Sequence, residues 1–216
     1  MKKNLLFACF LALCTLTLFG QTEGTAKILR PEEKWAIHVP AEAAPAGLKI
    51  IYSNLGTPTN AYSVVEAWEI AGPNSGITEF IALPFTPTSD SHVSQVRVAL
   101  QYDGSGADQV NLSLYADADG VPGTLLAGPV TVTNLPEEGT CCTLAVAKFS
   151  PIAITAGTQY WVAADTPLTG TGSDLVGQWN WVAKVSSEWA QDYGGAGWGQ
   201  IPSDALPAGA VLGTVP

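Results

Sequence analysis

The sequence predicts an all-β protein, built as an antiparallel, jelly-roll-like β-sandwich that follows a cleaved signal peptide. Only 13% of the 216 residues are charged, while 22 glycines and 15 prolines supply many turns. Several short segments alternate apolar and polar residues with a period of two, which is typical of half-buried strands. Turn residues separate these segments about every ten residues, and this spacing favours a sandwich or barrel over βαβ units.

Residues 1–20 have the layout of a secretory signal peptide. Lys2 and Lys3 form a short basic start, residues 5–19 are uncharged and mostly apolar, and Gly20 is a small residue at the expected cleavage point. The apolar run is shorter than the roughly 20 residues that a membrane-spanning helix needs. We therefore expect a secreted or extracytoplasmic protein with no membrane span after cleavage.

The rest of the chain is expected to form a lead-in or linker over residues 21–47, a β-sandwich domain over 48–200 and a flexible tail over 201–216. The tail is rich in Pro, Ala and Gly, which favours loose packing. Within the domain, strands are expected near residues 48–53, 62–71, 77–83, 96–102, 110–114, 125–133, 144–149, 158–164 and 176–183.

The charge of the chain excludes some partners. Removing Lys2 and Lys3 from the 9 basic residues leaves 7 against 19 acidic ones, a net charge near −12. A surface of this sign repels nucleic acid and anionic lipid, so neither is expected as a partner. The partner expected is a glycan or a cell-surface component, and no oligomeric state is predicted.

Neighbouring tryptophans are the main candidates for ligand binding. Trp179 and Trp181 are two residues apart on a predicted strand and share one face of it. With Trp161, they would stack on sugar rings if exposed, but large aromatic residues are common in cores, and the strand pair favours the core. Trp198 lies in a Gly-rich segment and is the better binding candidate.

The segment from Asp117 to Gly123 has two interpretations. The carboxylates of Asp117 and Asp119 are two residues apart and could converge on Ca²⁺. Gly120 comes too early for an EF-hand, however, and no acidic residue closes the loop. The Asp, Gly and Pro residues here are also those that a tight hairpin turn requires, which favours the turn. No other cofactor is expected.

Cys141 and Cys142 are adjacent, and three interpretations of them stay open. An exported protein can form disulfides, so one is a vicinal disulfide that rigidifies a turn. Another is a pair of reduced residues at the start of a strand. The third is a soft-metal site, for which no further Cys or His lies nearby in the sequence.

An ordered series of motifs resembles a known family. The motifs are Trp68-Glu-Ile-Ala-Gly, the segment from Leu112-Ser-Leu-Tyr to Gly-Val-Pro-Gly-Thr-Leu-Leu126, Gly139-Thr-Cys-Cys-Thr-Leu and Ala156-Gly-Thr-Gln-Tyr-Trp-Val. Over residues 48–182 the chain resembles the bacterial "choice-of-anchor" type of exported β-sandwich domain. The resemblance implies a surface-attached or released module of unknown ligand. Leu206-Pro-Ala-Gly lacks the Thr of a sortase signal, which favours release.

These observations rank the function classes. The leading hypothesis is a non-catalytic module for binding or for surface or matrix interaction, with carbohydrate as the candidate ligand. A structural envelope or matrix protein without a small ligand is one alternative. A small jelly-roll polysaccharide hydrolase or lyase is another. The sequence contains no nucleophile-elbow, zinc-protease or phosphate-loop motif, so such an enzyme would need paired carboxylates; the candidates by composition are Glu66, Glu69, Glu79 and Glu188.

Overall fold

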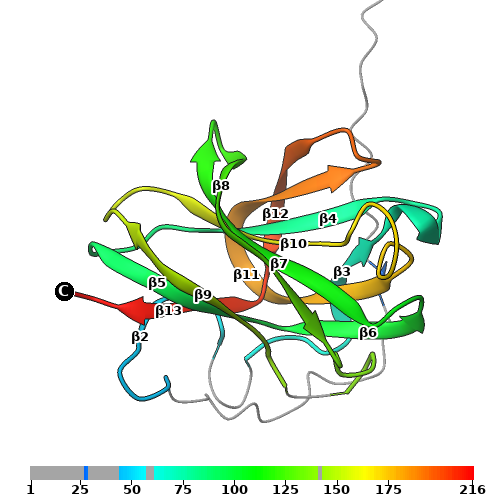
Figure 1. Cartoon of the computed structure of the whole chain (residues 1–216), viewed down its shortest axis with the longest axis horizontal. Coiled ribbons are helices and arrows are strands. Elements are labelled where there is room, and N and C mark those ends of the chain that lie inside the picture. Colours follow the sequence, from blue (N-terminus) through cyan, green and yellow to red (C-terminus); the bar gives the residue numbers. More distant parts are fainter. Residues whose placement is uncertain (1–26, 29–43, 57–60, 141–142) are drawn as a thin grey trace, which may run out of the picture.

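The computed structural model describes residues 27–28, 44–56, 61–140 and 143–216, and they form an all-β antiparallel fold. Two sheets pack against each other in a sandwich-like arrangement (Figure 1). The expected signal peptide, most of the lead-in, and Cys141 and Cys142 lie outside the described residues. In the part of the chain that is described, no helix is both long and apolar enough to cross a bilayer.

The larger sheet has nine strands and the smaller has four. The spatial order of the larger sheet is β1 (Lys27–Ile28), β3 (Glu66–Ala71), β11 (Val176–Tyr193), β4 (Glu79–Phe85), β10 (Tyr160–Asp165), β7 (Gln109–Ala118) and β8 (Val121–Thr133), while β6 (Leu100–Ser105) and β12 (Trp198–Pro207) also pair with β11. The smaller sheet has the order β2 (Lys49–Ser53), β13 (Gly209–Thr214), β5 (Ser91–Val98) and β9 (Ala145–Ile154). One short 3₁₀ helix, Pro73–Ser75, precedes β4.

The main core lies between the sheets. The larger sheet contributes alternating residues such as Leu112 and Leu114 on β7, and the smaller sheet contributes Val96 on β5 and Val211 on β13, all fully buried. Alternation with a period of two places one set of side chains from each strand in this core. The apolar positions that predicted the strands are therefore the positions that join the two sheets.

The segment expected as one strand over residues 96–102 is divided between the two sheets, so the single-strand prediction was wrong. β5 ends at Val98 in the smaller sheet, and β6 begins at Leu100 in the larger one. Ala99 lies between them, and its N–H donates to the carbonyl of Ala208 at 3.0 Å. The carbonyl of Ala99 accepts from the N–H of Asn180 at 2.9 Å. These bonds satisfy the backbone of Ala99 outside either strand, so the chain can change sheet there.

The C-terminal segment is a further correction. The prediction of a flexible tail over residues 201–216 was wrong, because residues 201–207 belong to β12 and residues 209–214 form β13. β13 pairs with both β2 and β5 and is thus an inner strand of the smaller sheet. Its Val211 and Leu212 are buried. The sandwich therefore extends to residue 214, and the small residues that suggested a loose tail are packed.

The burial of β13 gives a direct test. Leu212→Ala should lower the free energy of unfolding by about 2–4 kcal/mol, because it removes a buried side chain and leaves a cavity. Urea denaturation followed by tryptophan fluorescence measures this change. The control is Thr214→Ala on the same strand, where the side chain is exposed, and its effect should stay within about 0.5 kcal/mol. Equal, small effects would mean that residues 209–214 are a loose tail after all.

Candidate binding site between two hairpins

A second cluster of apolar side chains lies on the face of the larger sheet that points away from the main core. On β10, Val162 enters the main core, while the neighbours Trp161 and Ala163 belong to this second cluster. Ala82 on β4 and Ala190 on β11 complete its buried part. The partly buried side chains of Tyr115, Val121 and Trp198 pack against it. We call this side of the larger sheet the outer face.

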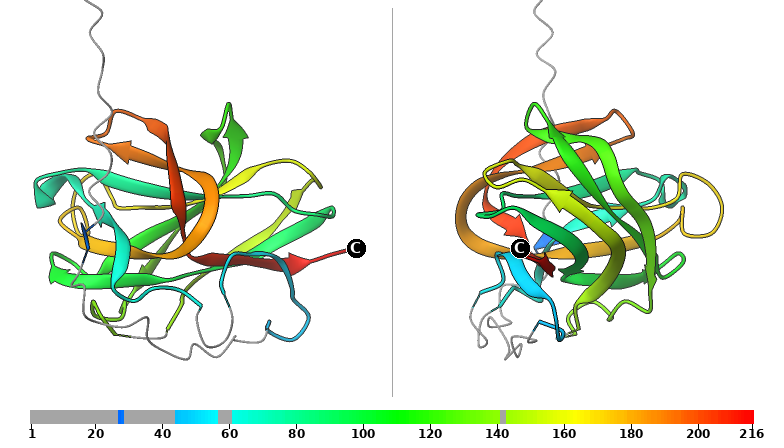
Figure 2. Two further views of the ribbon diagram at one scale, coloured as in Figure 1. Left: turned by 180° about the vertical axis from the view of Figure 1, so that it is seen from behind. Right: turned by 60° about the vertical axis from the view of Figure 1, so that its left-hand side comes forward.

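Two hairpins project from the outer face. Figures 1 and 2 show the β7–β8 hairpin and the β11–β12 hairpin extending from the same side of the molecule. The Nε2 group of Gln200 on β12 donates a hydrogen bond of 2.8 Å to the carbonyl of Gly120 at the tip of the β7–β8 hairpin. This contact joins two segments that are 80 residues apart in sequence.

A pocket lies between these hairpins. It has a volume of about 410 Å³ and is lined by Pro84, Gly120, Gln159, Trp161, Glu188 and Gln200. We call it the hairpin pocket. Its lining combines an indole ring, two primary amides and one carboxylate, so it offers apolar contact together with hydrogen-bond donors and acceptors. A volume of this size is in the range of small-molecule sites.

Asp117 fixes one side of the hairpin pocket. Its Oδ1 accepts hydrogen bonds from Nε1 of Trp161 at 2.7 Å and from Nε2 of Gln159 at 2.8 Å. Its Oδ2 accepts from the backbone N–H of Gly120 at 3.2 Å. Burial acts to raise the pKa of Asp117, but the hydrogen bonds from Trp161, Gln159 and Gly120 outweigh it, and the pKa lies below its usual value. Asp117 is therefore a charged residue that orients two of the side chains lining the pocket.

The predicted hairpin turn is confirmed at Asp119 and Gly120. They are the two residues between β7 and β8, with φ angles of 54° and 85°. Positive φ at both central positions is the geometry of a type I′ turn, for which Asp-Gly is a preferred pair. The calcium hypothesis required Asp117 and Asp119 to converge on an ion. The oxygens of Asp117 are instead engaged by three donors, and the described residues contain no group of three or more Asp, Glu, His or Cys suited to hold a metal.

The tryptophans predicted as ligand-binding residues occupy different environments. Trp179 is fully buried and donates from Nε1 to the carbonyl of Ala208 at 2.9 Å. Trp181 is half-buried, and its ring lies 4.8 Å from that of Trp68. Both pack in or against the main core, as the core interpretation of this pair expected. Trp161 lines the hairpin pocket with little exposed surface, and Trp198 is half-buried on the outer face.

Two of the acidic candidates, Glu69 and Glu79, lie close enough for their charges to interact, whereas Glu66 and Glu188 contact other residues. Glu66 accepts a hydrogen bond from Nε1 of Trp181 at 3.0 Å, and Glu188 is exposed at the hairpin pocket. Glu79 is only 3% exposed and accepts a hydrogen bond from Nε2 of Gln191. Burial, and then the nearby charge of Glu69, raise the pKa of Glu79 to about 7, although the bond from Gln191 opposes this rise.

Asp165, at the end of β10, is a further perturbed acid on the outer face. Burial raises its pKa to about 6, against the opposing effect of a hydrogen bond with Asn111. Asn111 is the cross-strand neighbour of Asp165 on β7, and its Oδ1 also accepts from the hydroxyl of Thr131 at 2.8 Å. Asp165 therefore belongs to a polar row that crosses β10, β7 and β8.

Sequence reasoning missed the two amides of the hairpin pocket. Gln159 directly precedes the Tyr-Trp pair of β10, and Gln200 is two residues after Trp198 on β12. The spacing of Gln200 from Trp198 places both on one face of the strand. That signal could have been noticed, but the approach of Gln200 to Gly120 depends on contacts between distant hairpins.

No family model, curated protein or solved structure matches this chain. The resemblance to choice-of-anchor domains stays a prediction.

The role of Asp117 can be tested with two matched variants. Asp117→Asn should lower the free energy of unfolding by about 1–2 kcal/mol, because three donors lose a charged acceptor and one of them is the indole N–H of a buried tryptophan. Asp119→Asn removes the same charge at the neighbouring turn position, where Asn also tolerates positive φ, and should change stability by less than about 0.5 kcal/mol. Chemical denaturation of both variants measures the difference.

Equal losses for these two variants would contradict the assignment of a positioning role to Asp117. The same measurements with added calcium and with a chelator test the metal hypothesis. We expect the same melting temperature with calcium and with the chelator. An ion that bound only the folded protein would instead raise the melting temperature.

Glu79 predicts a dependence of stability on pH. Its pKa is about 7 in the folded protein and 4.5 as the ordinary value, so between these values the folded state holds a proton that the unfolded state has lost. The free energy of unfolding should therefore fall as the pH rises from about 4.5 to 7, by on the order of 1–2 kcal/mol from this group. Glu79→Gln should remove this part of the dependence and make the protein more stable than wild type at pH 8.

Thermal melts of wild type and variant at pH 5 and pH 8 provide the measurement. Glu188→Gln is the control, because it removes an exposed carboxylate and changes the net charge by the same amount as Glu79→Gln. A Glu79→Gln variant that follows the wild-type pH profile would show that Glu79 has an ordinary pKa.

Proposed function

We propose that this protein is an exported, non-catalytic β-sandwich module that binds carbohydrate at the hairpin pocket and the adjoining outer face. The observation that carries the proposal is the composition of the pocket, in which Trp161, Gln159, Gln200 and Glu188 line one cavity of about 410 Å³. Sugars present apolar ring faces and many hydroxyl groups. The half-buried indole of Trp198 beside the pocket suits the former, and the amides and the carboxylate of the lining suit the latter.

Trp198 extends this surface beyond the pocket. It pairs with Asp192 across the β11–β12 hairpin and packs against the outer-face cluster that contains Trp161. Gln200, two residues later, has its amide fixed on Gly120. A half-buried indole held by neighbours loses little conformational freedom when a ligand stacks on it. Trp198 is therefore the residue whose removal should weaken sugar binding most.

At the hairpin pocket, the carboxylates present support binding rather than glycoside hydrolysis. Hydrolysis by the usual route needs two carboxyl groups facing each other across the bond to be cleaved, about 5–10 Å apart. Glu188 is the only acid among the six described residues that line the hairpin pocket. The nearby Asp117 is engaged by Trp161, Gln159 and Gly120.

The export part of the proposal rests on the N-terminal sequence, where two lysines precede an apolar run and a small residue. The acidic composition suits a role outside the cytoplasm that involves neither nucleic acid nor anionic lipid. The resemblance to choice-of-anchor domains supports the same localisation outside the cytoplasm. It suggests a module that is released or displayed, and whose ligand lies on a cell surface or in a matrix.

The carbohydrate proposal predicts selective glycan binding. The purified protein should retain a limited set of glycans on an array, and calorimetry with the best of them should give a measurable affinity. Trp198→Ala should weaken that affinity by about tenfold or more, because truncation removes an aromatic contact of the kind that dominates binding sites. Gln159→Ala should weaken it as well, through the pocket.

Leu168→Ala is the matched control, since Leu168 is apolar and 67% exposed in the loop between β10 and β11, outside the pocket lining. It should bind as wild type does. A protein that retains no glycan, or a Trp198→Ala variant with wild-type affinity, would rule out the proposal.

A further inference from the structure

The internal hydrogen bonds of the hairpin pocket engage its donors and leave acceptors for a ligand. Nε1 of Trp161 and Nε2 of Gln159 both donate to Asp117. Nε2 of Gln200 donates to the carbonyl of Gly120. Both amides are thus oriented by partners that can only accept, which turns each Nε2 inward. Gln159 and Gln200 each keep a carbonyl oxygen, so the lining offers a ligand mainly acceptors.

Glu188 adds a carboxylate without an internal partner to these acceptors. Its side chain is exposed at the pocket. No group that the structure describes donates a hydrogen bond to this carboxylate or forms an ion pair with it. Asp192 on the same strand differs, because its Oδ1 accepts from the N–H of Gly197 at 3.0 Å, and Asp117 is held by three donors. Glu188 is therefore the carboxylate that a ligand in the pocket would meet.

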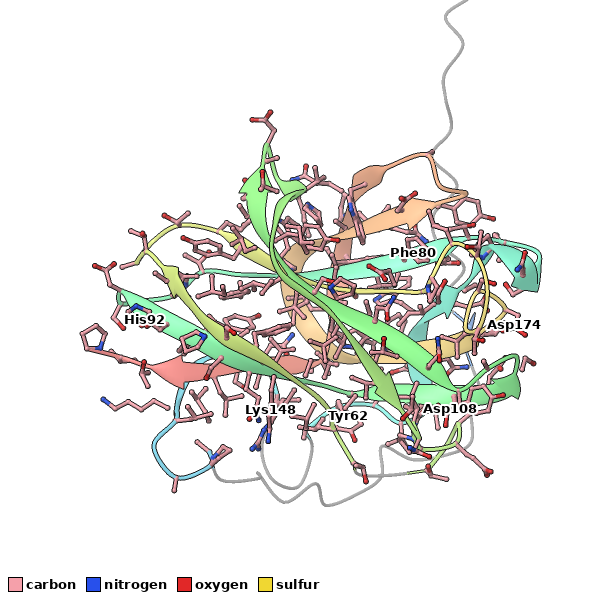
Figure 3. The ribbon with its side chains drawn as sticks, viewed as in Figure 1. Tyr62, Phe80, His92, Asp108, Lys148 and Asp174 are labelled. Carbon is pink, nitrogen blue, oxygen red and sulfur yellow. The ribbon has the colours of Figure 1, made fainter. Side chains whose placement is uncertain are left out.

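The basic side chains that the structure describes belong to the other sheet. They are Lys49 on β2, Arg97 on β5 and Lys148 on β9, all strands of the smaller sheet. Figure 3 shows Lys148 well away from Phe80, which pairs with Asp192 in the larger sheet. Among the described side chains, the acids around the hairpin pocket thus have no basic neighbours on their own sheet. The resulting negative potential favours a cationic ligand over a neutral or anionic one.

We propose that the ligand of the hairpin pocket is an amino saccharide, a glycan with free, protonated amino groups that contact Glu188. This inference rests on the proposed carbohydrate function and narrows its ligand. An ammonium group has three N–H donors and no acceptor, so it suits a lining of acceptors. A sugar hydroxyl has one O–H to donate and leaves the charge of Glu188 uncompensated. The half-buried indole of Trp198 beside the pocket suits the neighbouring sugar ring.

Calorimetric titration of the purified protein at low ionic strength tests the proposal. The probes are a glucosamine tetramer, the same tetramer fully N-acetylated, and a lysine tetramer, at a slightly acidic pH that keeps the amines protonated. We expect the glucosamine tetramer to bind about tenfold more tightly than the acetylated one, because acetylation removes the positive charge and leaves one N–H per nitrogen. The affinity for the glucosamine tetramer should fall as salt is added, since salt screens charge pairs.

Glu188→Gln keeps the size of the side chain and removes its charge, so it should abolish most of the preference for the glucosamine tetramer. Glu137→Gln is the matched control, because Glu137 is an exposed acid in the segment between β8 and β9 and does not line the pocket. It changes the net charge of the protein by the same amount and should keep the preference.

The outcomes separate this inference from the proposed function. Equal affinity for the two tetramers, or binding of other glycans but of neither tetramer, would overturn the inference and leave carbohydrate binding in place. Failure to bind any glycan would overturn both. A lysine tetramer that binds as tightly as the glucosamine tetramer would show attraction by charge alone and overturn the amino-saccharide class. Equal losses for Glu188→Gln and Glu137→Gln would do the same.

Discussion

Three backbone hydrogen bonds around Asn180 hold the two sheets together where the chain changes sheet twice. The N–H of Asn180 donates to Ala99, the N–H of Ala99 donates to Ala208, and the N–H of Ala208 donates to Asn180. Nε1 of Trp179 adds a fourth bond, to the carbonyl of Ala208. All four residues are buried, where an unpaired backbone group would be costly. This closed set of bonds lets β5 continue as β6, and β12 as β13, across the sandwich.

The long strand β11 connects this junction to the hairpin pocket. Its first residues pair with β3 and β6 near Asn180, and its last residues pair with β4 and β12. The curvature of β11, visible in Figures 1 and 2, brings Glu188 and β12 over the outer face. Asp117 and the bond from Gln200 to Gly120 then fix the facing hairpin. The pocket is therefore formed by contacts between elements that are distant in sequence.

The sequence by itself determined the all-β class, the alternating core positions and the Asp119-Gly120 turn, because period-two burial and turn geometry are local properties of the chain. It also favoured the core for Trp179. Only the tertiary structure decided that the strand pattern breaks at Ala99, that Leu212 belongs to an inner strand, and that Gln200 reaches Gly120 on the facing hairpin. Each of these depends on pairing between segments far apart in sequence, and alternation alone does not specify which strands become neighbours.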